Sequence, residues 1–273
     1  MNDASFAGSI PALYEEHLVP LMFEPFAEEL AQRLAAIDHG AVLETAAGAG
    51  ALTRALARTL PPDVRIVATD LNEAMLSALE RHPNAWPPPP RPAVAWKTAD
   101  AQSLPFADGE FEAVVSQFGM MFLPDKIAGF REARRVLAPK GRFVFNLWDR
   151  LDENELSLVV DRAAAALFPQ NPSRFFERAP FGYHDRARIQ ADLEAAGFTD
   201  VAIEVIQRTT TATADHAALG LCQGTPLRGE IEARGGDLAE VTTKVSSALH
   251  AHFGGAIFTN RMQALVVTAT FAP

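Results

Sequence analysis

Three carboxylates lie at or just beyond the ends of predicted strands, and they are the side chains best suited to bind a ligand. They are Glu44, Asp70 and Asp100. The carboxyl ends of parallel strands meet at one edge of an open α/β sheet, where such sheets bind ligands. A carboxylate accepts hydrogen bonds from hydroxyl and amino groups and attracts positive charge. The three acids therefore predict a site for a cationic nucleoside, which carries no phosphate.

The turn after the first predicted strand consists of small residues. Ala46, Gly48 and Gly50 belong to a run without any large side chain, so the backbone can approach a ligand closely there. The run lacks the third glycine of a dinucleotide fingerprint, and Glu44 just ahead of it would repel a pyrophosphate. S-adenosylmethionine carries a sulfonium and an ammonium group, and an acid at this position suits it.

This stretch resembles motif I of the class I S-adenosylmethionine-dependent methyltransferases, in which an acid precedes a Gly-x-Gly-x-Gly run. Ala46 stands where the first glycine of that family usually lies, and an alanine is tolerated there if the local φ is negative. The resemblance implies S-adenosylmethionine as cofactor and S-adenosylhomocysteine as product. It also implies an α/β, doubly wound Rossmann-like fold with a mostly parallel seven-stranded sheet, an antiparallel edge strand and a helical lid insertion.

The second predicted strand ends in Asp70, which can accept both hydroxyl groups of a ribose. The segment is similar to the second cofactor motif of the family, and this implies that Leu71 and Met75 contact the adenine. The leading part of the chain is expected to form a short helix over 11–20 and a firmer helix that Gly40 ends. The resemblance allows Tyr14 in the short helix to reach the cofactor, with packing as the alternative.

Residues 100–112 carry the most specific resemblance. Asp-Ala-Gln at 100–102 is followed by Leu-Pro-Phe and then by Asp-Gly-Glu-Phe-Glu, as is typical of small-molecule methyltransferases related to the ubiquinone and menaquinone C-methyltransferases. The resemblance implies that Asp100 accepts a hydrogen bond from the adenine amino group and that the Ala101 N–H meets a ring nitrogen, with Gln102 in the same segment.

The fourth predicted strand ends at the mouth of this site, in Ser116, Gln117 and Phe118. In the family that this chain resembles, the backbone of the segment contacts the methionine moiety and its side chains face the acceptor. We therefore count the three residues among the predicted cofactor-binding residues.

We expect one methyltransferase domain over 1–273. It would consist of N-terminal helices (1–39), a cofactor-binding half (40–150), a lid insertion (151–183) and a C-terminal half (184–273) that completes the sheet. The two β-rich runs in the last part are expected to pair antiparallel at the edge of the sheet.

Composition excludes several classes of partner. The formal net charge of −10 argues against nucleic acid, since phosphate binding needs clustered Lys and Arg. The single cysteine, Cys222, excludes an internal disulfide and a multi-cysteine metal site. No apolar run approaches the ~20 residues of a membrane span, and residues 1–4 do not begin a signal peptide. We expect a cytoplasmic enzyme and leave its oligomeric state open.

The reaction itself needs little from the protein. Displacement at a sulfonium methyl needs no metal, and it needs a base only for an acceptor that stays protonated at neutral pH. No catalytic residue is therefore assigned. The candidate bases, each with a structural role as the alternative, are His17, Tyr183, His184 and His216. His250 and His252 lie two positions apart, on different helix faces, which argues against a metal site.

The lid segment predicts the kind of acceptor. Residues 151–183 carry more apolar surface than a connecting loop needs, in Leu151, Leu156, Val159, Phe168, Phe175, Phe176, Phe181 and Tyr183. We expect them to form a pocket with Gln117, Phe118 and Met121, although they could simply pack on the sheet. This predicts a small, partly apolar methyl acceptor. Two alternatives stay open, an NAD(P)-dependent oxidoreductase with a degenerate glycine motif and a non-catalytic nucleotide-binding module.

Overall fold

Within residues 10–80 and 86–272, which the computed structural model describes, seven strands form one sheet in the order β3-β2-β1-β4-β5-β7-β6. Strands β1 to β5 pair in parallel, and β7 runs antiparallel to both β5 and β6. The antiparallel pair closes one edge, with β6 outermost. The strands are β1 Ala41–Thr45, β2 Arg65–Asp70, β3 Ala93–Thr98, β4 Phe111–Gln117, β5 Leu137–Trp148, β6 Asp200–Ala212 and β7 Phe258–Thr270. The predicted Rossmann-like class I fold is confirmed.

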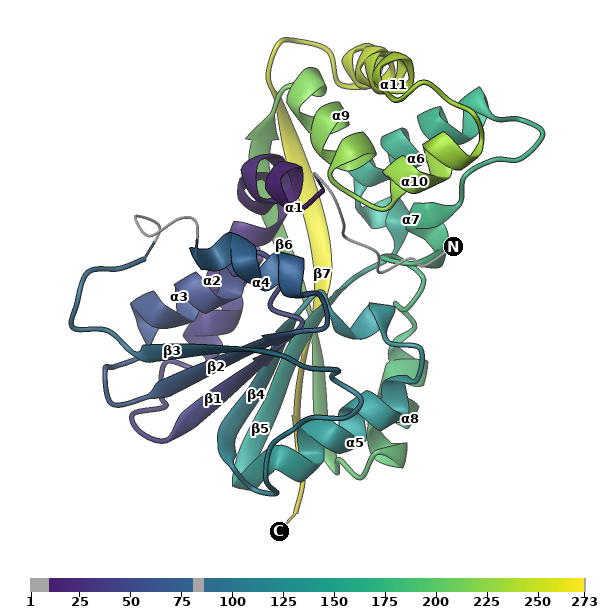
Figure 1. Cartoon of the computed structure of the whole chain (residues 1–273). Coiled ribbons are helices and arrows are strands. Elements are labelled where there is room, and N and C mark those ends of the chain that lie inside the picture. The colour runs from purple at the N-terminus through teal and green to yellow at the C-terminus, as the bar shows by residue number, and fades with distance from the viewer. Residues whose placement is uncertain (1–9, 81–85, 273) are drawn as a thin grey trace.

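Helices cover both faces of the parallel part of the sheet (Figure 1). Helices α2, α3 and α4 lie on one side, and α5 and α8 lie on the other. Strand residues alternate between the two layers: Val115 packs in the core with α2 and α3, whereas Val114 packs in the core with α5 and α8. These helices are α2 Glu24–Arg33, α3 Ala51–Thr59, α4 Glu73–Glu80, α5 Lys126–Val136 and α8 Arg186–Ala195. The sequence also predicts a helix from Glu73 to Arg81, and its predicted end at Arg81 falls outside the described residues.

The leading segment is one continuous helical stretch rather than two separate helices. Helix α1, Ile10–Leu13, runs into a π-helix, η1 Tyr14–Phe23, and then into α2. Pro20 lies inside η1 and cannot donate a backbone hydrogen bond, which favours a locally widened helix. The prediction that Gly40 caps the second helix is wrong, because α2 ends at Arg33 and the chain turns before Gly40.

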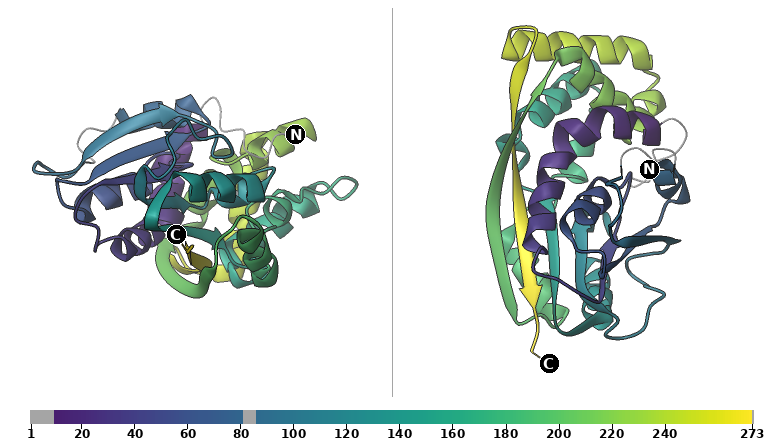
Figure 2. Two further views of the ribbon diagram at one scale, coloured as in Figure 1. Left: turned by 90° about the horizontal axis from the view of Figure 1, so that it is seen from below. Right: turned by 90° about the vertical axis from the view of Figure 1, so that its left-hand side faces the viewer.

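Strands β6 and β7 extend far beyond the other strands and support a second helical layer (Figure 2, right). Five helices form this layer, which we call the helical cap: α6 Glu155–Leu167, α7 Phe175–Arg178, α9 Ala214–Gln223, α10 Leu227–Ala233 and α11 Leu238–Phe253. Helix α11 packs on both α9 and α6. Helix α9, which begins after the capping hydroxyl of Thr213, was not predicted from the sequence. Two short 3₁₀ turns, η3 Met120–Phe122 and η4 Leu151–Glu153, follow β4 and β5.

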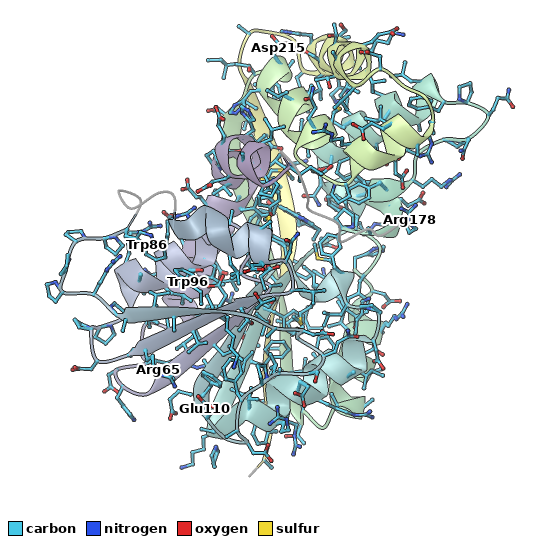
Figure 3. The ribbon with its side chains drawn as sticks, viewed as in Figure 1. Arg65, Trp86, Trp96, Glu110, Arg178 and Asp215 are labelled. Atoms are coloured by element: carbon cyan, nitrogen blue, oxygen red, sulfur yellow. The ribbon has the colours of Figure 1, made fainter. Side chains whose placement is uncertain are left out.

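The two ends of the sheet differ in what covers them. Arg65 and Glu110 lie together at the end away from the helical cap, with their side chains 3.3 Å apart (Figure 3). The carboxyl ends of β1, β2 and β4 point toward the cap, so any ligand bound there lies between the sheet and the cap. None of the described helices is both long enough and apolar enough to cross a membrane.

Candidate functional site

Glu44 ends up inside the protein at the carboxyl end of β1. Its side chain is 1% exposed and accepts a 2.6 Å hydrogen bond from the hydroxyl of Thr53 on α3. Burial raises the pKa of Glu44 from 4.5 to about 8, because the charged form loses its hydration. The carboxyl group is therefore largely protonated at neutral pH in the free protein. A cation bound nearby would favour its ionised form.

Asp70, at the end of β2, ties the small-residue turn to the neighbouring strand. One carboxylate oxygen accepts a hydrogen bond from the Gly48 N–H and the other from the Asn72 N–H, both at 2.8 Å. Burial raises the pKa of Asp70, and the two backbone hydrogen bonds oppose that shift. A carboxylate offers about four lone-pair positions, so two remain for ligand hydroxyl groups.

The backbone of the turn is left-handed at three positions. Gly48 and Gly50 have φ values of 55° and 76°, which glycine adopts readily. Ala46 has a φ of 53°, so the negative φ at which an alanine is free of strain is not adopted. A left-handed conformation costs an alanine about 1–2 kcal/mol. Gly119 leaves room for the Ala46 side chain in this conformation, because a Cβ at Gly119 would overlap with it.

The segment after β3 and the end of β4 bring further predicted site residues to the same edge. The Asp100 carboxylate accepts a 2.8 Å hydrogen bond from the Gln102 N–H across Ala101, and the Gln102 side chain in turn accepts one from the Asp125 N–H. The Ser116 hydroxyl donates to the Thr45 carbonyl at 3.0 Å, which joins the ends of β4 and β1.

Phe118 is the second strained residue at this edge, with a φ of 50°. Its N–H donates to the side-chain oxygen of buried Asn146 on β5, at 2.8 Å. The Phe118 ring stacks on Trp148 with 3.9 Å between the ring centroids. Gln117 instead points to the leading helix, since its amide donates to the Phe23 carbonyl at 2.7 Å.

The predicted adenine contacts differ in exposure. Leu71 is 67% exposed, whereas Met75 is buried and lies beside Gly48. Tyr14 stacks on Phe23 with ring centroids 4.9 Å apart. Burial, and next the negative charge of Asp70, raise the pKa of Tyr14, so the phenol is near this carboxylate and stays protonated.

An apolar pocket lies between this edge and the helical cap. It holds about 500 Å³ that no protein atom fills, part of it open to solvent. The leading helix, the ends of β4 and β5, and the cap all contribute to its wall. The lining residues are Tyr14, Leu18, Met22, Phe23, Phe118, Met121, Phe122, Trp148, Ser157, Phe175, Phe176, Pro180, Phe181, Leu221, Thr225 and Pro226.

Sequence analysis identified part of this wall. Phe118, Met121 and the lid residues Phe175, Phe176 and Phe181 line the pocket as expected, but Gln117 does not. The other apolar lid residues do not line the pocket. The Tyr183 hydroxyl donates a 2.7 Å hydrogen bond to the Asp192 carboxylate. The contributions of η1, Trp148 and α9–α10 were missed because no motif marks them.

The four candidate bases do not line the pocket. His17 and His216 pack edge to face, with ring centroids 4.6 Å apart, where η1 meets α9. Burial, and next the neighbouring His216, lower the pKa of His17. A ring nitrogen of His184 bonds the Phe181 carbonyl at 2.8 Å. These contacts give all four residues structural roles, so none of them is placed to remove a proton from a ligand in the pocket.

Two buried polar atoms beneath the site lack partners among the described residues. They are the hydroxyl oxygen of Thr45 and the amide nitrogen of Asn146. Thr45 ends β1, and Asn146 pairs with Gln117 at the end of β4, so both lie near the edge that carries the acids. Buried polar groups normally find a partner, which favours a polar ligand at this edge.

Comparisons with known proteins agree with this geometry. The family described as "Methyltransferase domain" matches residues 42–141. The ubiquinone/menaquinone biosynthesis C-methyltransferase UbiE of Pseudomonas aeruginosa is 30% identical over 174 residues, which span 59% of this chain and 65% of the relative. The match thus spans just under two thirds of that enzyme.

Solved structures share the fold across nearly the whole chain. The YcgJ protein of Bacillus subtilis has a TM-score of 0.57 and 18% identity, covering 91% of this chain and 99% of its own. Phosphoethanolamine N-methyltransferase 2 of Haemonchus contortus, bound to phosphomonomethylethanolamine and S-adenosylhomocysteine, has a TM-score of 0.59 and 15% identity, covering 96% of this chain and 57% of its own. At these identities the likeness shows the fold alone. The matched segment and the relatives are similar to methyltransferases, and the fold is that of solved methyltransferase structures.

Proposed function

We propose that the chain transfers the methyl group of S-adenosylmethionine to a small, largely apolar acceptor by in-line displacement. The observation that carries the proposal is the position of the apolar pocket directly beside the acidic edge of the sheet. Tyr14 lines the pocket while the charge of Asp70 acts on its phenol. Phe118 also lines it and follows directly after β4, which is bonded to β1 through Ser116 and Thr45.

The predicted cofactor residues have the chemistry that this ligand needs. Asp70 would accept the ribose hydroxyl groups, Asp100 and Ala101 would meet the adenine, and Glu44 would face the cationic methionine end. When bound, S-adenosylmethionine supplies a methyl group that is already activated by the sulfonium. The protein then has to orient the acceptor and exclude water, and much of the rate can come from that positioning.

The pocket supports an acceptor atom that is already nucleophilic at neutral pH. The four candidate bases lie outside it, and the raised pKa of Tyr14 keeps its hydroxyl protonated. Its apolar lining and its position beneath the cap favour a small molecule over a protein or nucleic acid. We also propose a cytoplasmic location, supported by the single, buried thiol of Cys222.

Thermal unfolding with candidate cofactors tests the proposal. A ligand at 100 times its Kd stabilises the fold by ~2.7 kcal/mol. We expect S-adenosylhomocysteine to raise the melting temperature by several degrees and NADH to leave it unchanged. The opposite pattern would support the oxidoreductase alternative. Binding without methyl transfer to a panel of amines, phenols, thiols and quinols would support the non-catalytic one.

A further inference from the structure

One hydroxyl group in the apolar pocket has unmet hydrogen-bonding capacity. Ser157 lies in the first turn of α6, is 1% exposed and lines the pocket. Its side-chain oxygen is buried and has no hydrogen-bond partner among the described residues. A buried hydroxyl without a partner costs free energy, so its presence in a mostly apolar wall calls for a ligand.

The other serine or threonine hydroxyl of the pocket wall is already occupied. Thr225 donates to the Leu221 carbonyl at 2.7 Å and accepts from the Leu227 N–H at 3.2 Å. It therefore stabilises the junction of α9 and α10 and has little capacity left. This contrast singles out Ser157.

We propose that Ser157 determines acceptor specificity by hydrogen bonding to one heteroatom of an uncharged aromatic acceptor. The inference rests on the proposed function, since it names the substrate class of the same pocket. Among the described lining residues there is no Asp, Glu, Lys, Arg or His, so a charged acceptor would lose its hydration without compensation. Phe118 and Trp148, whose stacked rings lie only 13° from parallel, both line the pocket, so part of its wall is aromatic.

Ser157 lies on the cap, whereas the predicted cofactor residues lie at the edge of the sheet. Different groups would therefore bind the acceptor and the cofactor. The serine hydroxyl both donates and accepts hydrogen bonds, so either an N–H group or a ring nitrogen satisfies it. A hydrocarbon of the same shape would leave the hydroxyl unpaired, and sites built in this way reject such analogues. The acceptor class is therefore a neutral aromatic molecule with a heteroatom, bound between the sheet edge and α6.

Matched probe pairs test the assignment without knowledge of the natural acceptor. Indole and indene differ in an N–H group, and quinoline and naphthalene differ in a ring nitrogen. Their Kd values would be measured by ligand-observed NMR on the full chain, with and without S-adenosylhomocysteine. In Ser157→Ala we expect the Kd of indole or quinoline to rise about 5–10-fold, the loss of one hydrogen bond. The Kd of indene and of naphthalene should change less than twofold.

Two controls keep the outcome unambiguous. Thr225→Val removes a hydroxyl that already has partners, so it should not change the ratio of heteroatom to hydrocarbon affinity. The melting temperature of Ser157→Ala should not fall, because the variant removes an unpaired polar group. Equal losses for both members of each pair, unchanged ratios in Ser157→Ala, or a lower melting temperature would overturn the assignment. S-adenosylhomocysteine binding, recorded in the same samples, reports on the proposed function separately.

Discussion

The carboxylate of Asp70 and the backbone N–H of Gly48 are joined by a 2.8 Å hydrogen bond that connects the ends of β2 and β1. The same carboxylate holds the Asn72 N–H, so one side chain orders both turns that would surround a nucleoside. Asp70 therefore shapes both turns, and we propose that its remaining lone pairs accept hydrogen bonds from a ligand.

Asp70→Asn tests this dual role. The amide can accept through one oxygen only, and its NH₂ group would face one of the two backbone donors. We expect the free energy of S-adenosylhomocysteine binding, measured by calorimetry, to become less favourable by about 1–3 kcal/mol. Asp108→Asn is the matched control, because Asp108 is exposed and pairs with Arg135 at 2.7 Å. Parent-like binding by Asp70→Asn would remove Asp70 from the site.

We propose that Glu44 makes cofactor binding depend on pH. Its pKa in the folded chain, about 8, lies above the unfolded value of 4.5. The folded state therefore holds an extra proton between these values, and the stability that Glu44 contributes, complete below pH 4.5, is lost as the pH rises through 8. A bound ammonium or sulfonium group favours the ionised form, so binding at neutral pH should release a proton.

We therefore expect the affinity for S-adenosylmethionine to increase from pH 6 to pH 8. Calorimetry in two buffers with different ionisation enthalpies would count the protons released. Glu44→Gln should abolish the release and weaken binding throughout this range. Proton release that persists in Glu44→Gln would mean that another group is responsible.

The strained Ala46 predicts a stabilising substitution. Ala46→Gly relieves a left-handed conformation at φ 53°, so we expect about 1 kcal/mol of added stability, or a rise of ~2–4 °C in Tm. Ala47→Gly, one residue along, lacks this relief and should lower Tm. Gly119→Ala should be strongly destabilising in the parent and less so in Ala46→Gly, since its Cβ would overlap with the Ala46 side chain. Thermal unfolding of the four variants, including the double one, would measure this coupling.

The lid segment should matter for methyl transfer and not for cofactor binding. Residues 170–180 include Phe175 and Phe176 of the pocket wall. Replacing them with a short Gly-Ser loop should leave S-adenosylhomocysteine affinity within about tenfold and abolish methyl transfer. The Ser173 hydroxyl and the Arg178 guanidinium, both in this segment, each donate a 2.7 Å hydrogen bond to the carboxylate of buried Glu230. The replacement therefore includes Glu230→Gln, and Glu230→Gln alone is the control. Parent-rate transfer by the replaced protein would show that the segment is not a lid.

Local signals made the cofactor half predictable. The run around Glu44 is strand, small-residue turn and helix within twenty consecutive positions, so period and residue size sufficed to place it. The left-handed Ala46 could not be predicted in this way, because it depends on Gly119, which is distant in sequence, and on the Asp70 bond that holds the turn.

The acceptor pocket depends on contacts that no local pattern reports. Tyr14, Trp148 and Leu221 meet there from the leading helix, a strand end and the cap. The π-helical turns of η1 depart from the 3.6-residue period on which helical faces are predicted. Helix α9 was missed because the alanine, glycine and cysteine residues within it give only a weak amphipathic pattern.

The long ribbon formed by β6 and β7 holds cap helices apart from the acidic edge of the sheet. The residues that line the acceptor pocket from the cap can therefore change independently of the acids. Their lower parts pair into the sheet beside β5, and their far ends enclose the chain segment that folds into α9, α10 and α11. Insertions or exchanges in that segment can reshape the pocket without altering the register of β1, β2 and β4, on which the acids depend. A laboratory evolution experiment that randomises only residues 213–257 should therefore yield enzymes with new acceptors and an unaltered nucleoside site.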